Sequence, residues 1–99
     1  MKLVRISDEK KLLLSVLLLA VAEQVPQYVR VKHRNADRDY RTKQRIAQAA
    51  RDFVQSKEFD DMAEIAGFDP NVLRSQSPAR AYAAYEKITE QQHIEDFYE

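Results

Sequence analysis

An eleven-residue apolar run, residues 12–22, is interrupted only by Ser15 and limits the possible folds more than any other feature of the chain. The run is too short to cross a bilayer as a helix. Ser7 is a candidate N-cap, and Asp8 and Glu9 suit the positive end of a helix dipole. We therefore predict a leucine-rich core helix over residues 8–25 that needs cover on nearly all sides. A second copy would supply part of that cover, so we also predict a homo-oligomer.

The same run leaves an alternative open, because it has features of a signal peptide. Four basic residues precede it, and Ala20 and Ala22 before Glu23 fit the small-residue cleavage pattern. Against export, Asp8 and Glu9 lie where only basic residues are expected. We predict a cytoplasmic protein without a membrane partner, with export as the alternative if residues 1–22 are a signal peptide.

Length and composition narrow the fold class. The chain has 99 residues, of which 44% are hydrophobic and 32% charged, with one glycine and three prolines. It is too apolar to be disordered and too poor in turn formers for a β-sandwich. A chain of this size supports one core. We therefore predict a single all-α domain over residues 1–99, a compact bundle of about five helices.

The residue types also argue against an enzyme. There is no cysteine, so disulfides, thiol nucleophiles and thiolate metal sites are excluded. His33 and His93 have no partner at metal-ligand spacing, and one glycine cannot make a glycine-rich phosphate loop. The acids Asp60, Asp61 and Glu64 are explained by their place in the first turns of a helix. We expect no metal, cofactor, catalytic residue or small-molecule substrate.

Helix signals divide the rest of the chain. Pro26 ends the first helix, and residues 27–39 are predicted to connect it to a basic amphipathic helix over 38–55, capped by Asp37 or Asp39. The predicted inward residues of that helix are Tyr40, Ile46, Ala47, Ala50, Phe53 and Val54.

Three shorter signals follow. Ser56 is predicted to cap a helix that ends at Gly67, and Asp69 to cap a fourth helix that begins with Pro70. The third helix would turn Phe59, Met62, Ala63 and Ile65 inward. Ser77 repeats the cap before Pro78, which begins a last helix over residues 78–99 with an acidic tail.

Charge is distributed unevenly, although sixteen basic and sixteen acidic residues cancel in total. Residues 28–51 contain eight basic and two acidic side chains, a net charge of +6. Residues 52–85 carry −3, and the tail from Glu86 carries −4. The basic block suits phosphate groups or the acidic tail of its own or a neighbouring chain.

The most specific local pattern lies in residues 59–74, FDDMAEIAGFDPNVLR. Ala63 is small where two helices would cross, Gly67 turns the chain, and Leu73 returns an apolar side chain to the first helix. The pattern resembles the helix-turn-helix motif of DNA-binding proteins, over a unit spanning residues 58–76. It is also similar to small phage and prophage proteins without a settled activity.

The resemblance implies a protein that binds double-stranded DNA, in transcription regulation or DNA packaging. Asn71 and Arg74 would read bases, because asparagine suits adenine and arginine suits guanine. Ser75 and Gln76 would also face the major groove. The predicted phosphate contacts are Arg80, Arg41, Lys43 and Arg45.

The alternative function is a non-catalytic interaction or assembly protein that forms a helical homo-oligomer. The same small residues at 63 and 67 would then hold a helical hairpin that contacts no DNA. The placement of Arg74 separates the alternatives. Arg74 on one face with Arg80 and the basic helix would favour DNA, whereas Arg74 tied to Asp60 or Asp61 would favour assembly.

Overall fold

The computed structural model describes residues 8–98, with side chains to residue 90. Within residues 8–98 the chain forms five α-helices and one 3₁₀ turn, without a strand. The elements are α1 (Asp8–Glu23), η1 (Pro26–Tyr28), α2 (Ala36–Val54), α3 (Lys57–Ala66), α4 (Pro70–Arg74) and α5 (Pro78–Tyr98). The predicted all-α class is confirmed. The predicted cap at Ser7 and the acidic side chains of the tail beyond residue 90 lie outside the described residues.

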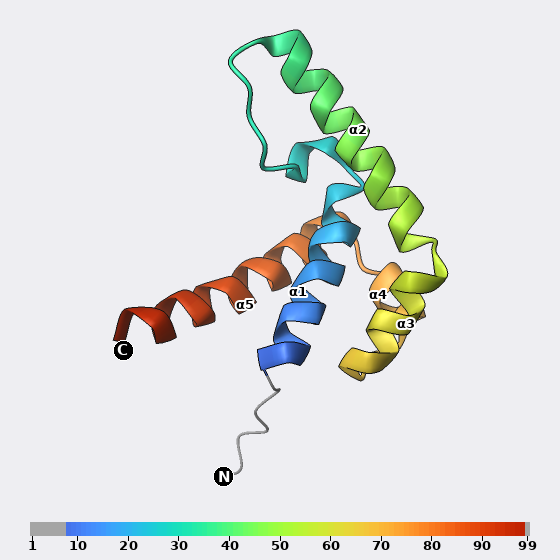
Figure 1. Cartoon of the computed structure of the whole chain (residues 1–99), viewed down its shortest axis with the longest axis vertical. Helices are drawn as coiled ribbons and strands as arrows, with labels where there is room; N and C mark the ends of the chain where they lie inside the picture. The colour runs from blue at the N-terminus through green and yellow to red at the C-terminus, as the bar shows by residue number, and fades with distance from the viewer. Residues whose placement is uncertain (1–7, 99) are drawn as a thin grey trace.

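Helix α1 is the centre of the molecule, as its leucines predict. It lies against α2, α3, α4 and α5, and Figure 1 shows it between α5 and α3. Leu17 and Val21 are completely buried, which contributes about 1.5–3 kcal/mol for each side chain. Cover is not complete, however, because Leu12 is 61% exposed and Val16 is 43% exposed one turn later.

The ends of α3 and the start of α4 follow the predicted signals. The Ser56 hydroxyl accepts the Phe59 N–H at 3.3 Å, and Gly67 ends α3 in the left-handed conformation with φ 85°. The Asp69 carboxylate accepts the Asn71 N–H at 2.9 Å and starts α4. These caps satisfy backbone groups that a helix leaves open at its ends.

The beginning of α2 differs from the prediction. Asn35, not Asp37 or Asp39, is the N-cap, since its side-chain oxygen accepts the Arg38 N–H at 3.1 Å. Asn and Asp are nearly equal as N-caps, so the sequence could not rank them. The two aspartates lie in the first turn, where the helix dipole favours them. The end of the preceding helix also differs from the prediction, because α1 ends at Glu23 rather than at residue 25.

Two residues predicted to face the core are exposed. Tyr40 is 66% exposed because α2 reaches the core only through its second half, where Ala47, Ala50 and Val54 are buried. Ile65 is 67% exposed because it lies outside the face of α3 that buries Phe59, Ala63 and Ala66. Both predictions of inward packing were wrong, since periodicity gives a helix face but not how far its cover extends.

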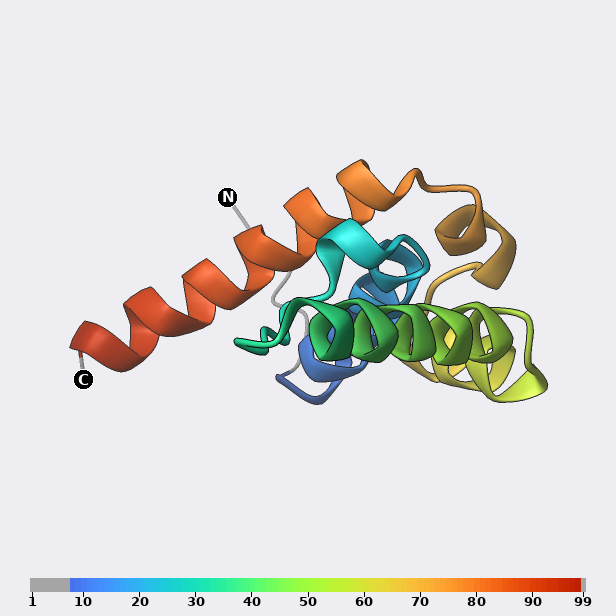
Figure 2. The same ribbon diagram turned by 90° about the horizontal axis from the view of Figure 1, so that it is seen from above.

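Two parts of the fold extend beyond the helices that pack around α1. The connector after η1 and the first half of α2 form one extension, seen at the top of Figure 1. The second half of α5 forms the other, and Figure 2 shows it extending away from the remaining helices. The first extension carries seven of the sixteen basic residues of the chain.

Candidate nucleic-acid interface

The connector and the first half of α2, residues 29–45, make up what we call the basic arm. It holds seven basic and two acidic side chains, a net charge of +5 with His33 neutral. Val29 is buried at its base. Its exposed basic residues are Arg30, Lys32, Arg34, Arg38, Arg41 and Arg45.

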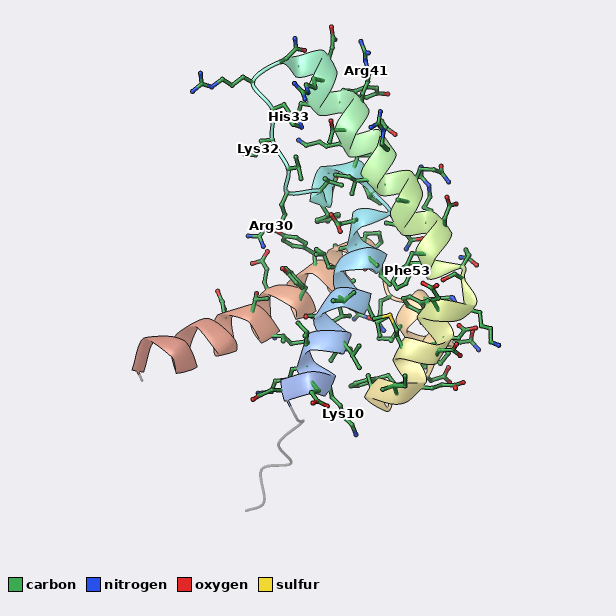
Figure 3. All side chains as sticks on the ribbon, in the orientation of Figure 1. Lys10, Arg30, Lys32, His33, Arg41 and Phe53 are labelled. Carbon is green, nitrogen blue, oxygen red and sulfur yellow. The ribbon has the colours of Figure 1, made fainter. Side chains whose placement is uncertain are left out.

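A pocket of about 540 Å³ lies in the basic arm between the connector and α2. Arg38, Arg41 and Arg45 follow one another at helical spacing, so they line one face of α2. Figure 3 shows His33 on the connector beside the first turns of α2, and Arg41 on the helix. The complete lining is His33, Asn35, Asp37, Arg38, Arg41, Thr42 and Arg45.

Hydrogen bonds hold the connector against the helix. The backbone N–H of His33 donates to Asp39 Oδ1 at 2.8 Å, and Lys43 Nζ lies 2.9 Å from Asp39 Oδ2. The hydrogen bond from Lys43, followed by that from His33, lowers the pKa of the Asp39 carboxyl below its usual 3.8. Asp39 therefore stays ionised at neutral pH and ties the connector to α2.

Aromatic contacts hold the base of the arm. The ring centroids of Tyr28 and Tyr82 lie 5.2 Å apart, and those of Tyr82 and Tyr85 lie 6.2 Å apart. The Arg30 guanidinium lies over the Tyr85 ring at 6.0 Å. Offset and tilted ring pairs of this kind are favourable, and so is a cation over a ring face. The connector is thus joined to α5 as well as to α2.

The pocket arginines have no anionic partner within the described part of the chain. Among those residues the ion pairs are Lys43 with Asp39 and Arg74 with Asp60. Arg38, Arg41 and Arg45 are all exposed. Their guanidinium groups therefore remain available to an external anion.

Arg74, the predicted base reader, is held by contacts within the chain, although its side chain is 21% exposed. Its Nε donates to the Val54 carbonyl at 2.7 Å, its Nη1 to Asn71 Oδ1 at 3.3 Å, and its Nη2 pairs with Asp60. The guanidinium also lies 5.0 Å from the centroid of the Phe59 ring. All of its donating nitrogens are engaged, so Arg74 joins α4 to α2 and α3.

The other residues predicted to face a major groove also make local contacts. Asn71 is exposed and accepts the bond from Arg74. The Ser75 hydroxyl donates to the Val72 carbonyl at 2.7 Å, and the Gln76 amide reaches the same carbonyl at 3.4 Å. Helix α4 itself ends at Arg74 after five residues. The candidate reading helix is therefore little more than one turn long.

The predicted phosphate contacts separate into three groups. Arg41 and Arg45 line the pocket together, whereas Lys43 is paired with Asp39. Arg80 is exposed in the first turn of α5 and is not part of the pocket lining.

Sequence analysis missed most of the remaining pocket lining, above all Arg38, His33 and Asn35. The spacing of Arg38 from Arg41 and Arg45 is a signal that could have found it. No local signal in the sequence indicates that His33 and Asn35 lie beside the arginines of α2.

Comparison with protein-family models, curated proteins and solved structures found no match. None of the helices among residues 8–98 has the length and apolar character needed to span a membrane. No group of three or more His, Asp or Glu side chains in that part of the chain is arranged to hold a metal ion.

Proposed function

We propose that this protein binds double-stranded DNA through phosphate contacts of the basic arm, and that α4 does not read bases. The observation that carries the proposal is the convergence of Arg38, Arg41 and Arg45 on one pocket without an anionic partner in the described chain. Arginine forms bidentate hydrogen bonds with phosphate and stays charged at every physiological pH.

The position of the pocket strengthens the argument. It lies at the N-terminal end of α2, where the helix dipole is positive and attracts anions. Basic side chains gain nothing from that end of a helix, so an external anion is the favourable partner there. The extension of the arm beyond the other helices leaves room for a long ligand (Figure 1).

Base reading by α4 has less support. Arg74 would have to leave three hydrogen-bond acceptors and the Phe59 ring before it could reach a base. The acids of α3 would also approach the same duplex and repel it. We therefore assign sequence-independent binding rather than recognition of a defined site.

The test is the binding of random duplex DNA, measured by fluorescence anisotropy over a salt series. Affinity should fall steeply with salt, and Arg41→Gln should reduce the slope of log K against log salt by about 1. Lys57→Gln is the control, since it removes the same charge from an exposed position on α3. No binding at low salt would reject the proposal, as would equal effects of the two variants.

A second candidate is assembly into a homo-oligomer, with a second copy of the chain as the partner. The intramolecular bonds of Arg74 favour it, and so do Leu12 and Val16, which are exposed one turn apart on α1. Burying these two side chains against a second copy would remove apolar surface from water. Light scattering tests it, because Leu12→Asp should reduce the mass of an oligomer to that of one chain.

A further inference from the structure

We infer that the pocket of the basic arm binds a phosphate monoester, the group found at the 5′ end of a DNA strand or on a free nucleotide. The inference rests on the proposed function and specifies which part of the ligand the pocket would take. Its basis is the charge, the donors and the shape of the pocket.

The charge of the pocket matches a dianion. Its lining holds three guanidinium groups and the carboxylate of Asp37, a net charge of +2 with His33 neutral. A phosphate monoester carries about −1.5 to −2 at pH 7 and offers three terminal oxygens. A diester inside a strand carries a single charge, so it would leave one arginine unneutralised.

The donors match the same group. The arginines can each present two parallel N–H groups to phosphate oxygens. The hydroxyl of Thr42 and the ring of His33 also line the pocket and add hydrogen-bonding groups to it. A monoester has enough acceptors for this set, because three oxygens are free rather than two.

The shape of the pocket favours a terminal group. The connector with His33 and Asn35 bounds one side, and the arginine face of α2 bounds the other. The volume of about 540 Å³ is in the range of pockets that hold small ligands. A phosphate within a duplex is flanked by nucleotides on both sides, whereas a terminal phosphate can enter such a hollow end-on.

The experiment compares one blunt duplex in two forms, with 5′ phosphates and with 5′ hydroxyls, at pH 7.5 and moderate salt. The full chain should bind the phosphorylated form about tenfold more tightly, the effect of one further charge-assisted hydrogen bond. Arg41→Gln should remove this difference. Lys32→Gln is the matched control, because it removes one charge from the same arm outside the pocket lining and should weaken both duplexes equally.

A second titration with a nucleoside 5′-monophosphate, followed by the backbone amide signals in NMR spectra, separates the two sources of the phosphate. Saturable shifts confined to residues 33–45 support the pocket, and competition with the phosphorylated duplex identifies the DNA end as a ligand. If the monophosphate binds and neither duplex does, the pocket serves a free nucleotide and the proposed DNA function fails. If both duplexes bind equally and the monophosphate causes no saturable shift, the DNA function stands and the inference is overturned.

Discussion

The two ends of α2 place arginines in opposite situations. At the N-terminal end, Arg38, Arg41 and Arg45 surround an open pocket, whereas at the C-terminal end Arg74 is bound by backbone, carboxylate and ring. The helix itself explains part of the contrast. Its last carbonyls are open acceptors, and Arg74 takes that of Val54, the final residue of α2. The first turn offers N–H donors instead, which compete with arginine for anions rather than binding it.

The contrast shows that an arginine is available to a ligand only where the fold offers it no acceptor. By sequence, Arg74 is the stronger functional candidate, because it lies in a motif and beside an asparagine. By structure, it stabilises the packing of α4. The predictions below test whether the two ends of α2 differ in this way.

The largest effect on stability is expected from a substitution in α3, which packs near the C-terminal end of α2. Phe59→Ala should lower the free energy of unfolding by about 3–5 kcal/mol, because Phe59 is completely buried and packs edge-on against Phe53. Tyr40→Ala in the basic arm should change it by less than about 0.5 kcal/mol, since Tyr40 is 66% exposed. Urea unfolding measures both. Similar losses would mean that the arm belongs to the cooperative core.

Arg74→Ala tests the role of the bound arginine. We expect a loss of about 2–3 kcal/mol, because the Val54 carbonyl and the Asp60 carboxylate lose a charged donor. DNA affinity at a temperature where the variant is folded should not change. If Arg74 instead reads a base, as the helix-turn-helix resemblance implies, the variant should fold almost normally and show a relaxed base preference. Unfolding and binding measured on the same sample decide between them.

Gly67→Ala should have a smaller effect at the same end of the molecule. The glycine has φ 85°, a conformation that costs a residue with a side chain about 1–2 kcal/mol. The variant should unfold at lower urea concentration with an unchanged slope. An unchanged midpoint would show that α3 and α4 can join without the left-handed turn, and that their junction does not depend on residue 67.

Much of the fold is predictable from sequence, because it depends on local signals. The cap residues Ser56, Gly67 and Asp69 act within one turn of where they stand, and the leucines of α1 require cover wherever the chain supplies it. The candidate site is less predictable. That Asp60 would occupy Arg74, and that His33 would return to α2, depends on contacts between residues distant in sequence.

Asp39→Ala is the most direct test of how the basic arm is held together, and we expect it to affect stability less than Gly67→Ala. Removing an acid raises the net charge of the arm, so electrostatics alone predicts tighter binding of every anion. Asp39 also holds His33 and Lys43, however, and without it the connector side of the pocket loses its tether. We therefore expect the variant to lose preference for the 5′-phosphorylated duplex while its affinity for the unphosphorylated duplex is kept or increased.

The pH dependence of stability checks the same tether. The pKa of Asp39 is lowered in the fold, so its contribution is present above the usual value of 3.8 and is lost as the pH falls through the lower folded value. Wild type and Asp39→Ala should therefore differ in stability by a constant amount between pH 5 and pH 7. The difference should shrink as the pH falls below 3.8 and vanish below the lower pKa that Asp39 has in the fold. A difference that persists in acid would mean that the uncharged side chain, not the carboxylate, holds the connector. In that case the open pocket of the arm would not depend on the ion pair with Lys43, and its arginines would owe their availability to the helix end alone.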